Sequence, residues 1–408
     1  MKNKYIEPIE RELDLSGVIE EASRCLLCND APCSMDCPAG TDPAKFIRSA
    51  RFRNFKGGAE TIRTNNALGA VCARVCPTDR YCQSHCPRAE IDRPIDIGKI
   101  QAFLTDYEAE YGLKVLEKGR SNGKKVAIVG SGPSGIQAAA SLARMGYSVT
   151  IYEKEAKAGG QLRYGIPEYR LPNRIVDNEI KKIKNLGVKI RTLVNVGTDI
   201  QMDELKLMFD AIILAPGYSL GKYLRDYESH PDVEIALDFL KRCKDHRGKI
   251  DITDNVLVVG GGDVAMDTAS SLMLLGAKDI TLAIFETFDE VKASQKEIET
   301  TRNLGATLLY GYVAEKVNGA EVTLKHRFLR STVTLNPSKV ILAVGQVPHV
   351  EGIGLKKEDI NSKVIQLNKG KVFITGDIAD GEKTVVYAVR NGKMVAHEVD
   401  EYLNGGKK

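Results

Sequence analysis

Cysteines are the first residues in this sequence whose type and spacing indicate chemistry. Eight of the nine lie between Cys25 and Cys86, and the ninth is Cys243. Thiols gathered in one region of a chain that is kept reduced favour metal binding over disulfides. The run reads Cys25-x2-Cys28-x4-Cys33-x3-Cys37-Pro38, then Cys72-x3-Cys76-Pro77, and finally Cys82-x3-Cys86-Pro87.

This spacing favours iron–sulfur clusters over zinc. Close cysteine triplets with a more distant fourth ligand, and a proline after the last cysteine of a run, are typical of iron–sulfur proteins. Structural zinc prefers two closely spaced cysteine pairs separated by a spacer, and only Cys25 with Cys28 fits that pattern well. Eight thiols suffice for two [4Fe-4S] clusters, and we therefore expect two.

A glycine-rich turn predicts a first dinucleotide site. An apolar strand leads into the G-x-G-x-x-G turn of Gly130, Gly132 and Gly135, and Glu153 ends the next strand. Glycines let backbone amides approach a pyrophosphate at the positive end of a helix. The carboxylate at the end of the second strand accepts hydrogen bonds from ribose hydroxyls.

A second turn of the same kind predicts a second dinucleotide. It reads Gly260-Gly261-Gly262-Asp263-Val264-Ala265, and Glu286 follows the next strand. Glycine turns without a ligand are the alternative, but each turn here has its acidic partner. Two adjacent dinucleotides are typical of flavin reduction by a nicotinamide, in which the cofactors carry the chemistry and no acid–base triad is needed.

The remaining residues suggest how electrons leave the flavin. The histidines are scattered, and we interpret His85 as a helix-surface residue and Cys243 as structural. Residues 250–340 contain no cysteine, which excludes the redox disulfide of thioredoxin reductase-like enzymes in that region. Electrons therefore leave the flavin either through the clusters bound by the cysteine run or directly to an acceptor that meets the flavin. The alternative class is a non-enzymatic redox sensor that binds FAD and clusters.

Composition places these sites in a soluble globular protein of two or three domains. The chain has 408 residues, of which 43% are apolar and 27% charged, and its net charge is +4. The chain has no basic block interleaved with aromatic residues, so a nucleic-acid partner is not expected. No apolar run is long enough to span a membrane. We expect the protein to lie in the cytoplasm.

The fold class expected from the pattern is α/β, with a helical domain before two Rossmann-like domains. Residues before the polar linker at 120–125 lack strand-like alternation, and we expect Asp14 or Ser16 to cap their first helix. The apolar strands Val340–Val344 and Val372–Thr375 are predicted to return to the first nucleotide domain, which makes the second an insertion. The expected domains are 1–120 (helical, two clusters), 121–249 with 339–408 (FAD), and 250–338 (NAD(H)).

Together these motifs resemble a known family over nearly the whole chain. The family is the flavin- and iron–sulfur-containing electron-input module shared by the small subunit of glutamate synthase and by dihydropyrimidine dehydrogenase. Length and opening segment look most similar to the bacterial NAD-dependent dihydropyrimidine dehydrogenase subunits. The marks are the cysteine run, Gly159–Pro167 (GGQLRYGIP) with Tyr169–Pro172 (YRLP), Gly260–Asp267 (GGGDVAMD), and Thr375-Gly376-Asp377 with Thr384-Val385-Val386.

The resemblance implies the residues that hold each nucleotide. Those for FAD are Gly130, Gly132, Pro133, Ser134, Gly135, Glu153, Gly160, Gln161, Leu162, Arg163, Gly217, Gly376, Asp377, Thr384, Val385 and Val386. Those for NAD(H) are Gly260, Gly261, Gly262, Asp263, Val264, Glu286 and Gly345. Family members that use NADPH commonly carry two arginines where this chain has Phe285 and Glu286, so NADH is expected here.

The resemblance also implies two interleaved sets of cluster ligands. One set is Cys25, Cys28, Cys33 and Cys86, and the other is Cys37, Cys76, Cys82 and Gln101. Cys72 would then be spare. The alternative, in which Cys72 takes the place of Gln101, stays open because thiolate is the commoner iron ligand.

The function implied is electron delivery from NADH, through FAD and two [4Fe-4S] clusters, to a partner. That partner is an FMN-containing dihydropyrimidine dehydrogenase catalytic subunit, which interconverts uracil or thymine and the 5,6-dihydropyrimidines in a hetero-oligomer. The alternative is a glutamate synthase small subunit or a related NAD(P)H:acceptor oxidoreductase. No side chain is expected to act as a catalytic acid or base.

Overall fold

The computed structural model describes residues 3–361, 366–367, 370–379 and 381–405, which form two compact units. The larger unit contains Glu10–Arg163, Asn173–Tyr218 and the described residues from Pro348 onwards. The smaller unit contains the described residues up to Ile9, Tyr164–Pro172 and Ser219–Val347. No described helix is long and apolar enough to cross a membrane.

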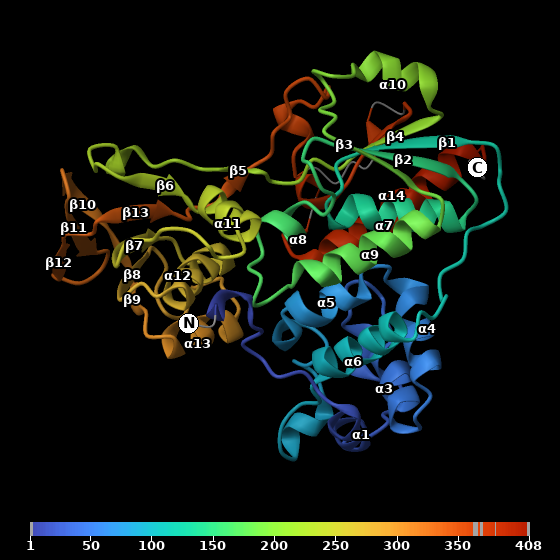
Figure 1. The fold of residues 1–408 in the computed structure, drawn as a ribbon, viewed down its shortest axis with the longest axis horizontal. Helices are drawn as coiled ribbons and strands as arrows, with labels where there is room; N and C mark the ends of the chain where they lie inside the picture. Colours follow the sequence, from blue (N-terminus) through green and yellow to red (C-terminus); the bar gives the residue numbers. More distant parts are fainter. Residues whose placement is uncertain (1–2, 362–365, 368–369, 380, 406–408) are drawn as a thin grey trace. The chain divides into compact units, whose positions relative to one another are not determined.

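The larger unit begins with a helical domain that carries the cysteines (Figure 1). Asp14, one of the two caps that the sequence predicts, caps its first helix by accepting a hydrogen bond from the Gly17 amide at 2.8 Å. Val18, Phe46 and Leu104 are fully buried in the helical core. The helices are α1 (Leu15–Ser23), α2 (Pro32–Met35), α3 (Pro43–Arg51), α4 (Phe55–Asn65), α5 (Gly69–Val75) and α6 (Ile97–Glu110).

A six-stranded sheet follows in the same unit, in the order β15-β16-β4-β1-β2-β3. Its strands are β1 (Lys125–Val129), β2 (Ser148–Glu153), β3 (Lys189–Thr192), β4 (Ala211–Leu214), β15 (Gln366–Leu367) and β16 (Val372–Ile374). All neighbours are parallel except β15 and β16. The sheet's helices are α7 (Pro133–Arg144), α8 (Gln161–Tyr164), α9 (Asn173–Asn185), α10 (Met202–Met208) and α14 (Val385–Leu403).

Small residues let helices α7 and α14 pack closely on one face of this sheet (Figure 1). A Cβ on Gly392 of α14 would lie 2.5 Å from the Ser134 carbonyl oxygen on α7, so only glycine fits there. Helix α5 of the cysteine domain contacts α9 and α14. The helical domain and the first nucleotide turn therefore belong to one packed body.

The smaller unit holds a second parallel sheet, in the order β6-β13-β7-β8-β9, with a three-stranded antiparallel sheet β10-β11-β12. Its parallel strands are β6 (Val233–Ile235), β7 (Asn255–Val259), β8 (Asp279–Ile284), β9 (Thr307–Tyr310) and β13 (Lys339–Leu342). The antiparallel strands are β10 (Tyr312–Asn318), β11 (Glu321–His326) and β12 (Thr332–Leu335), and β5 (Leu220–Gly221) pairs with β14 (Gln346–Val347). The helices are α11 (Ala236–Asp245), α12 (Asp263–Leu275) and α13 (Gln295–Asn303).

One strand assignment from the sequence was wrong. Strand β13 aligns Val340 with Leu257 of β7 and with Val233 of β6, so it completes the second sheet and does not return to the first. Strand β16 does return, because Phe373 aligns with Ile213 of β4. Apart from Lys339 at the start of β13, both strands are apolar, and that pattern identifies a buried parallel strand without saying which sheet holds it. The inserted unit accordingly contains Ser219–Val347, a longer segment than the expected 250–338.

Short 3₁₀ helices complete the described secondary structure. They are Lys4–Ile6, Thr78–Arg80, Pro87–Glu90, Arg225–Tyr227, Lys357–Asp359 and Gly376–Ile378. Thr78–Arg80 directly follows Cys76-Pro77, and Pro87–Glu90 begins at the proline of Cys86-Pro87. Proline cannot continue a preceding helix but suits the first position of a new turn.

A buried cation joins the cysteine helices to the sheet domain. Arg63 on α4 is fully buried, and its guanidinium lies 2.6 Å from Glu179 on α9 and 2.7 Å from Glu108 on α6. It also donates to the Ala67 carbonyl, while Lys182 pairs with Glu108. A buried charge is tolerated only when its partners are present, so this cluster fixes how α4 and α9 dock.

We expect Arg63→Met to destabilise the larger unit by about 3–5 kcal/mol, because two buried carboxylates lose their shared partner. Lys206→Met is the matched control, since Lys206 forms an exposed ion pair with Asp203, and such pairs contribute about 0–1 kcal/mol. Urea unfolding, followed by circular dichroism, measures the change in unfolding free energy for both variants. Equal midpoints for the two variants would contradict the docking role of Arg63.

Candidate functional sites

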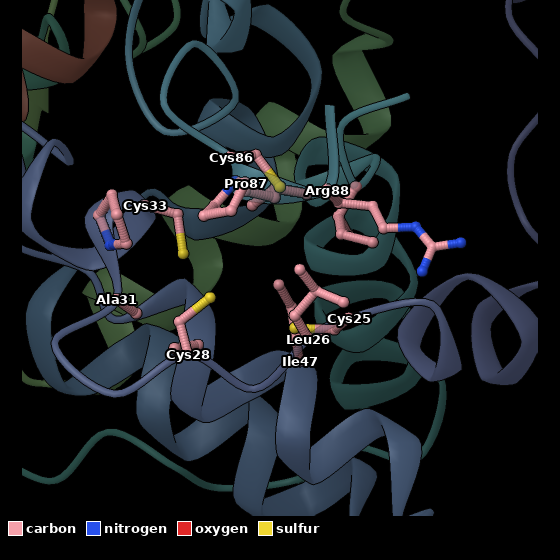
Figure 2. A pocket seen from close by; sticks show the side chains of 13 residues that line it. Cys25, Leu26, Cys28, Ala31, Cys33, Ile47, Cys86, Pro87 and Arg88 are labelled. Atoms are coloured by element: carbon pink, nitrogen blue, oxygen red, sulfur yellow. The ribbon is translucent and has the colours of Figure 1, made fainter. Parts of the chain in front are cut away.

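Four of the cysteines surround one cavity in the helical domain. Cys25 follows α1, Cys28 lies in the next loop, Cys33 is on α2, and Cys86 precedes Pro87. Figure 2 shows their sulfur atoms around the same space. The cavity measures about 370 Å³ including its opening to solvent, and these four are the cysteines of the first predicted ligand set.

The chemistry of this cavity fits an iron–sulfur cluster. Apart from Arg88, its other lining residues are apolar: Leu26, Ala31, Pro32, Ala44, Ile47, Pro87, Ile95 and Ile97. Burial raises the pKa of the Cys33 thiol to about 11, and nearby thiolates of Cys25, Cys86 and Cys28 add to that rise. Thiolates crowded into a dry site need a compensating positive charge, which bound iron supplies. Among the described residues no three histidine, cysteine or acidic side chains are placed to hold a single metal ion.

A second group of cysteines lies nearer to the sheet domain. Burial raises the pKa of Cys76, and neighbouring thiolates of Cys72, Cys82 and Cys37 raise it further, so these four thiols interact. Burial raises the pKa of Cys72 to about 12, although a hydrogen bond with Asn66 opposes the shift. The structure therefore brings Cys72 together with the three cysteines of the second predicted set.

Gln101 is also beside this group. It lies on α6, is nearly buried, and its Nε2 donates a 2.7 Å hydrogen bond to the Gly69 carbonyl at the start of α5, the helix that carries Cys72. This bond orients the amide and leaves its oxygen for another partner. One candidate for the fourth ligand, Cys72, thus lies on α5, and the other, Gln101, contacts the start of that helix.

The first nucleotide turn contains glycines of two kinds. Gly130 has φ +102°, and a Cβ there would lie 2.2 Å from the Ala215 carbonyl oxygen, while a Cβ on Gly135 would lie 2.2 Å from the Gly130 carbonyl oxygen. These two are required by the protein itself. Gly132 has an ordinary φ of −66°, and nothing lies within 4 Å of a Cβ built on it. Its lack of a side chain leaves room for a ligand at the amino end of α7.

Other residues predicted for FAD lie around that turn. A Cβ on Gly160 would lie 2.9 Å from the Gly132 Cα, and the Ser134 hydroxyl lies 2.8 Å from that of Thr375, beside Gly376. Glu153 is buried and accepts a hydrogen bond from the Ser131 amide at 3.0 Å. The turns at 130–135, 159–160 and 375–376 therefore meet at the carboxyl end of the first sheet.

Several predicted FAD residues have structural partners of their own. Arg163 pairs with Asp177 and donates to the Ala158 carbonyl, so it braces the loop that carries Gly160. Leu162 is fully buried. Gln161 Nε2 lies 3.4 Å from the Tyr218 carbonyl oxygen, next to Gly217, and burial raises the pKa of Asp377 to about 6.

The last of the residues predicted for FAD lie at the start of α14, where Thr384 is the N-cap and Val385 and Val386 are the first helical residues. The Thr384 hydroxyl accepts from the Tyr387 amide. Sequence reasoning missed Tyr81, which lies between Cys76 and Cys82 and donates a 2.6 Å hydrogen bond to Glu382 just before this helix. Its ring also approaches that of Tyr387, with centroids 6.0 Å apart. No local pattern could reveal a contact between residues 301 positions apart.

The smaller unit repeats the arrangement at the second turn. Gly260 has φ +139°, and a Cβ there would lie 2.3 Å from the Ala343 carbonyl oxygen. Gly262 precedes α12, has nothing within 4 Å of a Cβ, and so leaves the helix amides open. A Cβ on Gly261 would lie 2.8 Å from Glu286 Oε2, so Glu286, the residue predicted to bind the ribose, lies directly at the turn.

The other predicted NAD(H) residues frame this turn. Asp263 accepts from the Ser294 amide at 2.8 Å, Val264 is half-buried behind it, and Gly345 (φ +103°) follows β13. Sequence reasoning missed an ion pair in which Arg170 lies 2.7 Å from Asp267 and 3.0 Å from Glu297. This pair joins the YRLP and GGGDVAMD motifs.

Comparison with known proteins shows the family to which the chain belongs. Residues 2–113 match the family described as dihydropyrimidine dehydrogenase domain II, 4Fe-4S cluster, and residues 124–392 match pyridine nucleotide-disulphide oxidoreductase. The chain is 49% identical over 407 residues to the NAD-dependent dihydropyrimidine dehydrogenase subunit PreT of Escherichia coli K12, covering 99% of this chain and 98% of that protein. The chain belongs to the PreT family. Its cofactors are accordingly FAD, NAD(H) and [4Fe-4S] clusters, as expected.

More distant relatives show how widely the module occurs. The chain is 31% identical to the beta subunit of the NADP(+)-dependent formate dehydrogenase of Moorella thermoacetica, over 92% of this chain and 60% of that protein. It is 27% identical to the glutamate synthase [NADPH] small chain of Escherichia coli K12, over 94% of this chain and 91% of that protein. The structure of Mycobacterium tuberculosis FprA with NADPH matches with TM-score 0.58 at 17% identity, covering 69% of this chain and 85% of that one, and confirms the α/β fold class.

Gly132→Ala and Gly262→Ala provide a paired test of the two turns. Neither added methyl group would contact protein atoms, so we expect the free energy of unfolding of each cofactor-free variant to stay within about 1 kcal/mol of the original. Gly132→Ala should lower the FAD bound per chain, while Gly262→Ala should keep FAD and raise the KM for NADH about tenfold or more.

Each variant controls for the other, because each leaves the second turn unchanged. Bound FAD is measured by absorbance after denaturation, and KM by steady-state oxidation with an artificial acceptor. Full FAD content in Gly132→Ala would show that this turn does not carry the pyrophosphate.

Proposed function

We propose that this chain is the electron-input subunit of an NAD-dependent dihydropyrimidine dehydrogenase. It oxidises NADH and delivers the electrons, through FAD and two [4Fe-4S] clusters, to a separate FMN-containing catalytic subunit that interconverts pyrimidines and 5,6-dihydropyrimidines. The observation that carries this proposal is the similarity to PreT, at 49% identity over 99% of this chain, and the chain contains both glycine turns and all the cysteines of the predicted sets.

The residues of the first turn suit FAD. Bound FAD supplies the change from two-electron to one-electron transfer, because a flavin accepts a hydride and releases electrons singly. Gly132 admits the pyrophosphate to the amides at the amino end of α7, and Glu153 accepts from the ribose. Gly160, Gly376 and Asp377 complete the cradle, and Arg163 holds the Gly160 loop through Asp177.

We assign the cluster ligands in two sets of four. Cys25, Cys28, Cys33 and Cys86 form the first, which the shared cavity supports. Cys37, Cys76, Cys82 and Gln101 form the second. The Gly69 carbonyl orients the Gln101 amide and leaves its oxygen for another partner, and this observation favours Gln101 over Cys72.

Metal analysis tests this assignment. Anaerobically purified protein should contain about eight irons and eight labile sulfides per chain, because two sets of four ligands hold two [4Fe-4S] clusters. Gln101→Ala should lose the second cluster or convert it to a three-iron form, while Cys72→Ala should keep the full content. The reverse result would make Cys72 the ligand, and stoichiometric zinc without sulfide would reject the clusters.

The second cysteine set is the one that touches the sheet domain. Tyr81 joins its loop to Glu382 at the start of α14, and Lys393 on α14 donates a 2.7 Å hydrogen bond to the Ala39 carbonyl, two residues after Cys37. The first set instead lies among α1, α2 and α3, where Leu26 and Met35 are exposed. We infer that the second set lies on the flavin side and the first on the partner side.

The nucleotide in the smaller unit is NADH in this proposal. Glu286 lies at the glycine turn, where a carboxylate accepts from ribose hydroxyls and repels the 2′-phosphate of NADPH. Glu286→Arg should therefore shift the ratio of kcat/KM values towards NADPH by at least about tenfold, since a guanidinium binds phosphate. Glu299→Arg, an exposed change on α13, is the control. Similar kcat/KM values for the two nucleotides in the unchanged protein would contradict the assignment.

We infer a separate catalytic subunit because the similar PreT proteins are named as subunits of a dihydropyrimidine dehydrogenase. The two described units hold the cysteine helices and two nucleotide turns, whereas pyrimidine reduction needs a further site such as an FMN-bearing barrel of about 250 residues. The higher identity to PreT than to the glutamate synthase small chain favours a pyrimidine-reducing partner.

Reconstitution tests this function. The isolated chain should oxidise NADH with dyes but leave uracil, thymine and 2-oxoglutarate with glutamine unchanged. Addition of an FMN-containing dihydropyrimidine dehydrogenase subunit should start pyrimidine turnover. Pyrimidine turnover by the isolated chain would remove the need for a partner, and activity only with a glutamate synthase large subunit would favour the alternative.

A further inference from the structure

Lys393 connects α14 with the second cysteine group. Its Nζ donates a 2.7 Å hydrogen bond to the carbonyl of Ala39, two residues after Cys37. A Cβ built on Gly40 would lie 3.7 Å from the same nitrogen. The Gly40 amide donates to the Cys37 carbonyl at 2.8 Å, so the ammonium contacts the turn that begins at this predicted cluster ligand.

The packing of α14 fixes the backbone from which this side chain extends. Gly392 directly precedes Lys393, and a Cβ there would lie 2.5 Å from the Ser134 carbonyl oxygen and 3.0 Å from the Gln137 Cβ. Both of these residues belong to α7, the helix that begins at the first nucleotide turn. The backbone of Lys393 is therefore set against the nucleotide-turn helix, while its ammonium reaches the cysteine loop.

The Lys393 ammonium is a partly buried charge that lacks a carboxylate partner. Among the described residues no aspartate or glutamate pairs with it. Burial lowers the pKa of Lys393, and the thiolate of Cys37 opposes that shift. Arg63, by contrast, has two carboxylates as partners. A charge that is removed from water needs an opposite charge nearby, so a negative group is expected beside Lys393.

A [4Fe-4S] cluster held by thiolates supplies such a negative group. The cluster with its thiolates is an anion, and it becomes more negative by one charge when it accepts one electron. The electron comes from the flavin that NADH has reduced, so the two electrons of one NADH pass in two single steps. A cation close to the cluster stabilises the reduced form more than the oxidised form, and therefore raises the reduction potential.

We propose that Lys393 tunes the second cluster: its ammonium raises the reduction potential of the cluster held by Cys37, Cys76 and Cys82, and so favours electron transfer from the flavin. This inference rests on the proposed function in one respect, namely that the second set of ligands holds a [4Fe-4S] cluster. Lys393 acts through its charge on another group, so it is a positioning residue. The alternative is that Lys393 only ties α14 to the loop by its hydrogen bond.

Redox titration of the anaerobically purified holoprotein tests the proposal. Lys393→Gln keeps a hydrogen-bond donor but removes the charge. It should make the one-electron reduction of the second cluster at least about tenfold less favourable, which is a shift of about 59 mV to more negative potential. Lys393→Arg keeps the charge and should stay close to the original potential. Electron paramagnetic resonance during stepwise photoreduction measures the potentials, and the signal lost in Cys76→Ser belongs to the second cluster.

Arg390→Gln is the matched control for the loss of a positive charge. Arg390 lies on the same helix but is exposed, so water and salt screen its charge. This variant should leave the potentials of both clusters unchanged. Lys393→Gln should itself keep the original iron content, the bound FAD and the potential of the first cluster, because its effect is confined to the second cysteine group.

Four outcomes would overturn the inference. An unchanged potential of the second cluster in Lys393→Gln would show that the ammonium does not act on it. An equal shift in Lys393→Arg would make the side chain's shape decisive, and equal shifts of both clusters would indicate a disturbed cysteine domain. Loss of the second cluster from both variants would make Lys393 a structural tie. A content of about four irons in the unchanged protein would instead reject the ligand assignment of the proposed function, so the two failures are distinguishable.

Discussion

The docking of the cysteine helices on the first nucleotide domain depends on one buried guanidinium. Electron transfer falls steeply with distance, so cluster ligands and flavin residues must be held at a fixed separation. Arg63 is fully buried between Glu108 and Glu179, which come from helices on either side of the boundary. A displaced helix would leave these charges unpaired in a dry interior, which costs far more than the loss of an apolar contact. Tyr81 and Lys393 then add the contacts that bring the second cysteine set to α14.

Each nucleotide turn contains one glycine that the protein's own packing requires and one that leaves room for a ligand. Gly130 and Gly260 are demanded by neighbouring carbonyl oxygens and by positive φ, whereas Gly132 and Gly262 meet nothing in the protein. The first kind explains how strand and helix pack so closely, and the second keeps the helix amides accessible. The acidic residues of the two turns differ in burial, because Glu153 is buried beside Ser131 while Glu286, beside Gly261, is only partly buried.

Local sequence patterns predicted the fold class, the two glycine turns and a cap at Asp14 or Ser16, because each depends on residues close in sequence or on a motif with fixed geometry. The grouping of the four cysteines that line the cavity was implied by the family resemblance. The sheet that contains β13 could not be predicted, because an apolar strand suits either sheet. The contacts of Arg63 with Glu179, 116 residues apart, and of Arg170 with Asp267 were equally inaccessible. Long-range partners of single charged residues are set by tertiary packing, which leaves no periodic signal.

The central claim is that electrons leave this chain through its cysteine-bound clusters, and a variant without the first cluster tests it most directly. Cys25→Ser combined with Cys28→Ser removes two sulfurs from the cavity, and Cys243→Ala, far along the chain, is the control. FAD content and NADH oxidation with a flavin-directed dye are measured beside pyrimidine reduction by the reconstituted pair. We predict FAD content and dye reduction within about twofold of the original, because the nucleotide turns are unchanged, and loss of pyrimidine reduction. Pyrimidine reduction at the original rate would contradict the account.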